Sequence, residues 1–116
     1  MPTVRLNLVV AESDEVSKRD VRDIEQAVAF EEKYEATINL VEGAEDILVA
    51  PPQLAGSKVL VLTSSVAISV RLNDLLATEM TGVTMLVLSA TGITGLYLSN
   101  ESETTAKVAI SLYGDA

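Results

Sequence analysis

The sequence contains no cysteine, no histidine and no tryptophan, and these absences exclude several kinds of chemistry. Without cysteine the chain can form neither a disulfide nor a thiolate metal site. Without histidine it can form no Ser-His-Asp triad and no ordinary zinc site, because these need an imidazole or thiolate ligand. Any catalysis would have to use carboxylates, lysine or tyrosine, and we expect a protein that is not an enzyme.

Basic residues are also scarce, and the chain is strongly acidic. It contains 17 acidic and 8 basic residues, which give a formal net charge of −9. Nucleic-acid binding takes its affinity from clustered Lys and Arg, whereas the cations here are scattered. We therefore expect no nucleic-acid partner and no membrane partner. The charge is uneven, since residues 1–46 hold 12 of the acidic and 5 of the basic residues.

The first residues show no cationic region followed by an apolar run, and no apolar run approaches the roughly 20 residues of a membrane span. We expect a protein that is made in a cytoplasm. With 116 residues, of which 48% are apolar, the chain can bury a core, so we expect one domain over residues 1–116.

Several segments of the sequence show the two-residue period that is typical of β-strands. Apolar and polar residues alternate over 3–10 and 106–113, and the run 58–62 is apolar throughout. Thr63-Ser64-Ser65 is expected to reverse the chain, so that 58–62 and 66–72 form a hairpin. The expected strands are residues 3–10, 25–41, 47–49, 58–62, 66–72, 83–88, 93–98 and 106–113. The expected buried face of the first strand consists of Val4, Leu6, Leu8 and Val10.

Strands with reversals about every 8–12 residues are typical of sandwiches and barrels. The sequence shows no alternation of strands with helices that would indicate a parallel sheet. We therefore predict an all-β protein, an antiparallel β-sandwich or jelly-roll-like barrel of about eight strands. Its core is expected to be aliphatic, because the chain has one Phe and three Tyr.

The acidic segment 12–23 permits two interpretations. A short helix within 14–29 is one, because three apolar residues there have helical spacing behind a cap such as Ser17 (Val21, Ile24 and Val28). We favour the other, a loop to about residue 23 followed by a long bent strand over 25–41, because a period of two continues to Leu40.

Two groups of carboxylates are candidates for calcium binding or acid–base chemistry. Neither has the spacing of a calcium loop, so we interpret both as solvated loops. A glycosidase would also need a sugar cleft, usually with aromatic platforms, and aromatic residues are few here. The groups are Glu12, Asp14 and Glu15, and Glu42, Glu45 and Asp46.

Gly92-Ile93-Thr94-Gly95 lacks the lysine and the following helix of a phosphate-binding loop. We interpret it as a hairpin turn in which Gly92 takes a positive φ and Gly95 marks a bulge or a close approach of strands. Arg71 is expected to be an exposed ion-pair partner rather than an anion ligand. No residue is assigned a catalytic, cofactor-binding or metal-binding role, and no cofactor is expected.

Four segments carry a resemblance to a known class of proteins. A strand with Val-Arg-Leu-Asn is followed by a connection and then by Gly-Ile-Thr-Gly-Leu-Tyr-Leu-Ser-Asn before the closing strand. This pattern resembles the small β-sandwich virion structural proteins of tailed bacteriophages, and it covers about residues 34–116. The segments are residues 34–43, 58–65, 68–73 and 93–100.

The resemblance implies a non-enzymatic structural role in the virion. Such a protein assembles in the host cytoplasm, binds other virion proteins and copies of itself, and forms part of the capsid decoration, the neck or the tail. The alternative is a receptor- or carbohydrate-binding module on a tail fibre or baseplate. The acidic half could dock on a basic neighbour or keep free subunits apart, which predicts assembly that depends on salt.

Overall fold

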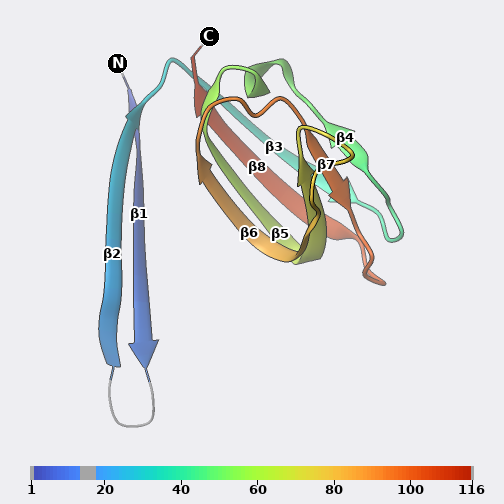
Figure 1. Ribbon diagram of the computed structural model, residues 1–116, viewed down its shortest axis with the longest axis horizontal. Coiled ribbons are helices and arrows are strands. Elements are labelled where there is room, and N and C mark those ends of the chain that lie inside the picture. Colours follow the sequence, from blue (N-terminus) through green and yellow to red (C-terminus); the bar gives the residue numbers. More distant parts are fainter. Residues whose placement is uncertain (1, 14–17, 116) are drawn as a thin grey trace.

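The computed structural model describes residues 2–13 and 18–115, with side chains described at 2–8 and 25–115. These residues form eight antiparallel strands and one short 3-10 turn (Figure 1). The predicted all-β fold of about eight strands is confirmed. The elements are β1 (Thr3–Ser13), β2 (Lys18–Ala29), β3 (Glu32–Leu40), β4 (Ile47–Val49), η1 (Pro52–Leu54), β5 (Ser57–Leu72), β6 (Met80–Ser89), β7 (Leu96–Ser99) and β8 (Ala106–Gly114).

The strands belong to two sheets of unequal size. β1 and β2 form a two-stranded sheet, which we call the arm. The other six strands form one sheet, which we call the body, in the order β3-β8-β5-β7-β4 with β6 paired to β5. In Figure 1 the body is curled into a half-barrel and the arm stands beside it. The chain passes from arm to body through residues 30–31.

β5 is the longest strand of the body, and its bend curls the sheet. Residues 57–64 of β5 pair with β8 and residues 69–72 pair with β7, while β6 follows β5 along both parts. The register with β6 shifts between Thr63 and Ile68, and there Ser64 Oγ donates a 2.6 Å hydrogen bond to the Val66 carbonyl. An irregularity of this kind bends a strand. β7 is thereby brought into one core with β8.

The predicted chain reversal at Thr63-Ser64-Ser65 is wrong, because β5 runs through these residues as one strand. Thr63 pairs with Met85 on one side and with Ala109 on the other, so its backbone is held by two neighbouring strands. The Ser65 hydroxyl accepts a 2.8 Å hydrogen bond from the Lys107 amide. Pairing with distant strands therefore outweighs the local preference of Ser and Thr for turns.

The favoured interpretation of the N-terminal third is also wrong. Residues 18–23, expected in a loop, belong to β2, and the expected strand 25–41 is divided between the arm and the body. The alternative helix is not present over 18–29, and its first residues, 14–17, lie outside the described part of the chain. The reason is that β1 needs a partner for its backbone groups, and β2 pairs with it from Thr3↔Ala29 to Ser13↔Lys18.

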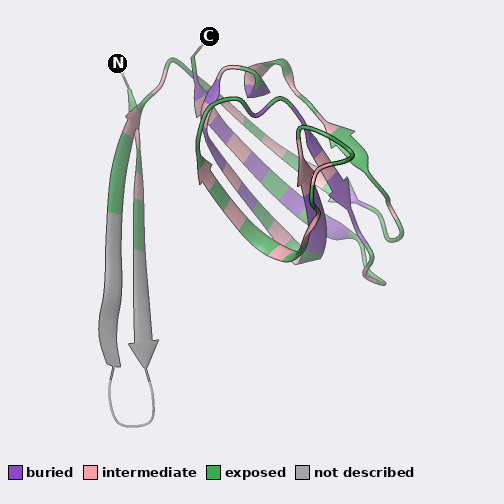
Figure 2. Cartoon of the chain, viewed as in Figure 1, coloured by how far each residue is buried: buried purple, intermediate pink, exposed green. Residues whose placement is uncertain are grey.

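The hydrophobic core lies on the concave face of the body (Figure 2). The face of β8 predicted to be buried is confirmed, since each of its four residues is at most 1% exposed. In contrast, the predicted face of the first strand is not buried, since Val4 and Leu6 are half-buried and Leu8 is 52% exposed; the Val10 side chain lies outside the described residues. The fully buried core residues of β5, β7 and β8 are Leu60, Leu62, Val70, Leu96, Leu98, Ala106 and Val108, with Ile110 and Leu112 at 1%.

Candidate functional site

Asn73, the last residue of the Val-Arg-Leu-Asn segment, ties the end of β5 to the turn before β7. Its Oδ1 accepts a 2.7 Å hydrogen bond from the Thr94 amide, and its Nδ2 donates a 3.0 Å bond to the Gly92 carbonyl. Gly92 has a φ of 86°, so the predicted positive φ is confirmed, but the predicted hairpin is wrong, because β6 and β7 both pair with β5 and not with each other. A Cβ at Gly95 would lie 3.4 Å from Leu48 Cδ1, an ordinary side-chain contact, so neither the predicted bulge nor a close approach of strands is seen there. These motif residues hold the fold together.

Asn100, at the end of the second motif, is fully buried and forms a second polar centre. Its Nδ2 donates to the carbonyls of Leu40 (2.8 Å) and Thr104 (2.9 Å). Its Oδ1 accepts from the amide (3.0 Å) and the hydroxyl (2.6 Å) of Ser102. No role was predicted for either asparagine, although each stands directly after an apolar strand and beside a turn.

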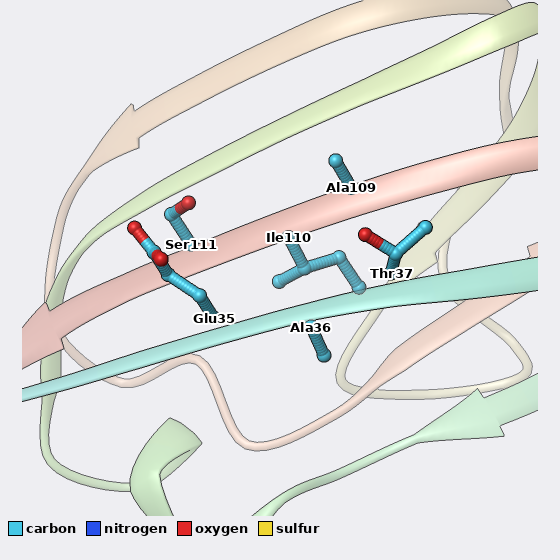
Figure 3. A pocket seen from close by; sticks show the side chains of 6 residues that line it. All are labelled: Glu35, Ala36, Thr37, Ala109, Ile110 and Ser111. Atoms are coloured by element: carbon cyan, nitrogen blue, oxygen red, sulfur yellow. The ribbon is translucent and has the colours of Figure 1, made fainter.

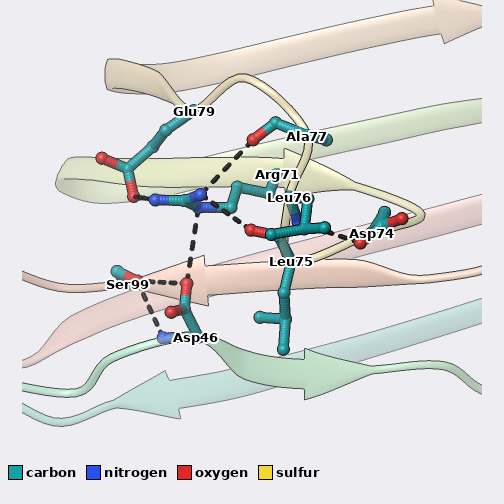
Figure 4. Close-up of polar contacts among 8 residues, drawn as sticks. All are labelled: Asp46, Arg71, Asp74, Leu75, Leu76, Ala77, Glu79 and Ser99. Carbon is teal, nitrogen blue, oxygen red and sulfur yellow. Dashed lines mark hydrogen bonds and ion pairs between the residues drawn. The ribbon is translucent and has the colours of Figure 1, made fainter.

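Arg71 is an ion-pair partner, as predicted, but it is half-buried rather than exposed (Figure 4). Its guanidinium lies 3.6 Å from Asp46 Oδ1 and 3.3 Å from Glu79 Oε2. It also donates hydrogen bonds to the backbone carbonyls of Leu75 (2.9 Å) and Ala77 (3.4 Å). Arg71 therefore fixes the loop between β5 and β6.

This loop presents two apolar side chains to solvent. Leu76 is 92% exposed and Leu75 is 46% exposed. The Leu76 amide donates a 2.9 Å hydrogen bond to Asp74 Oδ1, so the tip of the loop has a defined conformation. A well-held loop with an apolar tip is one candidate contact surface.

Replacing Arg71 with methionine should open this loop while the body stays folded. The carbonyls of Leu75 and Ala77 lose a charged donor, so we expect a fall of about 1 kcal/mol in the free energy of unfolding. Hydrogen exchange should become faster at the amides of residues 74–77. Leu76→Ser is the control, because that side chain is exposed and its loss should change neither measurement. Unchanged exchange in Arg71→Met would contradict the role given to Arg71.

The arm is fixed to the body at its base. The Phe30 ring lies edge-on to the Tyr113 ring, with centroids 5.0 Å apart and an interplanar angle of 72°. The Glu31 amide donates a 2.8 Å hydrogen bond to the Gly114 carbonyl. Gln26 Nε2 donates a 3.0 Å bond to Ser89 Oγ on β6. These contacts place the start of the arm against the convex side of the body.

The convex side of the body has an unusual composition where β6, β5 and β8 pair. Three rows of paired residues cross these strands, and none of their nine side chains is charged, although 22% of the chain is. We call these rows the outer strip. From the base of the arm outward, the rows are Ser89-Val59-Tyr113, Val87-Val61-Ser111 and Met85-Thr63-Ala109.

Along β5, the middle strand of the outer strip, exposure increases with distance from the base of the arm. Val59 does not belong to the core cluster of the concave side, yet it is 0% exposed, whereas Val61 is half-buried and Thr63 is exposed. On β6 all three residues of the strip are exposed, Val87 at 45% and Met85 at 64%. The outer strip is thus covered on β5 at the base and open beyond it.

The arm carries a matching apolar face. Val4 pairs with Val28, and Leu6 pairs with Gln26, so these side chains share one face of the two-stranded sheet. We call this face the arm face. It begins at the outer strip, because Gln26 donates a hydrogen bond to Ser89. Val4, Leu6 and Val28 are half-buried, whereas Leu8, the next residue outward, is 52% exposed. The arm face and the outer strip therefore share a base, and each is uncovered farther out.

The opposite face of the arm is polar, where Arg5 and Glu25 form an exposed ion pair at 3.6 Å. Beside the outer strip, on β3, the Glu35 carboxylate lies 3.0 Å from the Lys33 ammonium and raises the pKa of Lys33. Lys33 also lies 5.8 Å from the centre of the Tyr113 ring. Charged residues thus border the two apolar faces without entering them.

Two shallow hollows lie on the body, and the lining of the first includes Ala109 and Ser111 of the outer strip. One, of about 310 Å³, lies along β3 and β8 (Figure 3), and Glu35 is its single carboxylate. The other, of about 440 Å³, has two carboxylates, Glu32 and Asp115, but both are exposed and Asp115 pairs with Lys58 at 3.0 Å. Neither hollow holds a pair of carboxylates away from water.

The two groups of carboxylates were interpreted as solvated loops. In the group Glu42, Glu45 and Asp46 all three residues are exposed, and Asp46 is bound to Arg71. In the other group Glu12 belongs to β1 rather than to a loop, and the Glu12 side chain, Asp14 and Glu15 lie outside the described part of the chain. Within the part that the structure describes, no cluster of three or more Asp or Glu side chains is placed to hold a metal ion. The same part contains no helix that is long and apolar enough to cross a membrane.

No protein-family model matches the chain, and a comparison with curated proteins finds no match.

Proposed function

We propose that this chain is a non-enzymatic structural subunit of a tailed-phage virion that holds its neighbours through surface contacts. The observation that carries the proposal is the pair of uncovered apolar faces, the arm face and the outer strip. The motif resemblance over about residues 34–116 supports the virion setting, and the geometry supports a role in assembly.

A two-stranded sheet is marginal in water unless its apolar face is covered. Here the covering ends near the base of the arm, and Leu8 is left 52% exposed. The facing strands of the body leave Met85 and Val87 exposed as well. Contiguous apolar surface without charge is typical of protein interfaces, because charged residues are depleted at interface cores. A partner protein would bury both faces together.

The proposal is tested on purified particles of the phage that encodes the chain. Quantitative mass spectrometry of density-purified virions should find the protein in many copies per particle, resistant to a wash at high salt. A glycan array probed with the purified protein should show no binding. Absence of the protein from the particles would overturn the proposal, and specific glycan binding would favour the receptor-binding alternative.

A further inference from the structure

We propose that the arm of a second copy covers the outer strip, and that two copies exchange their arms reciprocally. This inference rests on the proposed function and specifies its first contact. In the pair, the arm face of each copy lies on Val61, Val87 and Met85 of the other. Both uncovered faces of each chain are then buried, and a two-fold axis closes the assembly.

The chain itself supplies both halves of the contact. At the positions whose side chains are described, the arm face and the outer strip carry no charged residue, and their most exposed large apolar side chains are Leu8, Met85 and Val87. A neutral strip on a chain of net charge −9 does not favour a basic partner, because charge complementarity would require acidic residues within the strip. The surface of this chain that matches the strip is the arm of another copy.

The lengths of the two surfaces also agree. The three rows of the outer strip cover residues 85–89 of β6, which span about 17 Å at about 3.4 Å per residue. Residues 3–8 of β1, the part of that strand whose side chains are described, span about 20 Å at the same rise. This part of an arm is therefore long enough to cover the outer strip.

The arm is held in a position from which it can reach a neighbour. Only residues 30–31 separate β2 from β3, and the Glu31 amide is bound to the Gly114 carbonyl. The Phe30 amide donates a 3.0 Å hydrogen bond to the Pro2 carbonyl, which closes the base of the arm itself. These contacts, with Gln26 on Ser89, fix the base of the arm, and in this position Leu8, Val87 and Met85 stay exposed in the single chain. Exchange of arms between copies would cover them.

The absence of cysteine from the chain allows a test by disulfide trapping. Leu8→Cys is made in one preparation and Val87→Cys in another, and the two are mixed and oxidised mildly. Arm exchange predicts that a disulfide-linked heterodimer forms in this mixture. The control is a mixture of Leu76→Cys and Val87→Cys, in which the first thiol lies on an exposed loop remote from the arm. The heterodimer of the first mixture should form at least about tenfold faster than that of the control. Equal rates in the two mixtures would overturn the inference.

Light scattering on the unmodified protein provides a second readout. We expect a pair of chains whose dissociation constant falls when the salt concentration rises from about 50 mM to about 500 mM, because salt screens the repulsion between acidic copies. Val87→Glu should weaken the pair at least about tenfold, since a buried charge opposes the contact. Leu76→Glu should leave the pair intact.

A single chain with both Leu8→Cys and Val87→Cys tests the competing arrangement. If it closes an internal disulfide and stays monomeric, the arm covers its own strip and the inference is wrong. A monomer that is nevertheless present in virions would refute arm exchange and leave the proposed function standing. A pair of chains that never enters virions would refute the proposed function and leave arm exchange standing.

Discussion

Replacing Asn100 with alanine is expected to lower the free energy of unfolding by about 3 kcal/mol, because four hydrogen bonds are lost at a fully buried site. The Leu40 carbonyl is the group most affected, since Leu40 is 3% exposed and water cannot readily replace the lost donor. The loop between β7 and β8 also loses the side chain around which Ser102 and Thr104 are arranged. The effect is large because one amide serves two separate parts of the chain.

Urea denaturation followed by circular dichroism measures this loss. Asn39→Ala is the matched control, because Asn39 is exposed on β3 and its replacement should cost less than about 0.5 kcal/mol. The Asn100 variant should keep the slope of the unfolding transition while its midpoint moves to lower urea. If the two variants unfold at the same urea concentration, Asn100 does not organise the core as the hydrogen bonds indicate.

Strands that bury one face within the body could be predicted from the sequence. β8 is the clearest example, because its apolar residues alternate without interruption and each lies in the core. The short strand at 47–49 was also predicted, since the Pro51-Pro52 pair that follows it cannot continue a sheet ladder. In both cases a local pattern and a local stop signal agree with the tertiary structure.

The errors arose where pairing with distant segments decides the structure. The Ser and Thr residues at 63–65 suggest a turn locally, yet β6 and β8 flank β5 there and keep it extended. The acidic segment has few apolar residues, and β2 forms because β1 offers a continuous set of backbone partners. Neither effect is visible in a short window of sequence, because the partner strand lies outside it.

The candidate site was missed for a related reason. Met85 and Val87 extend an apolar run in which Leu86 and Leu88 face inward, so the sequence does not show which residues stay uncovered. The pattern over 3–10 predicted a buried face, and Leu8 is instead exposed in the single chain. The inferred contact between copies would explain why apolar residues alternate along β1 although its own chain leaves Leu8 exposed.

Replacing Gly114 with alanine is expected to disrupt the junction of arm and body and to lower the free energy of unfolding by about 3 kcal/mol. Gly114 ends β8 between two strands, paired with Ser57 on β5 and with Glu32 on β3. A Cβ there would collide with the Gly56 carbonyl oxygen and would lie 2.6 Å from Ser57 Cα. These are backbone atoms, so no side-chain rotation relieves the overlap, and the strands must separate.

The separation should also loosen the arm, because the Gly114 carbonyl accepts the hydrogen bond from the Glu31 amide. We therefore expect faster hydrogen exchange at Glu31 together with the lower urea midpoint. Ser111→Ala is the control, since residue 111 lies on the same strand and already has a Cβ. Stability within about 0.5 kcal/mol of that control would show that the β5–β8 junction tolerates a methyl group. Faster exchange at Glu31 without loss of the β8 amides would instead locate the damage in the arm alone.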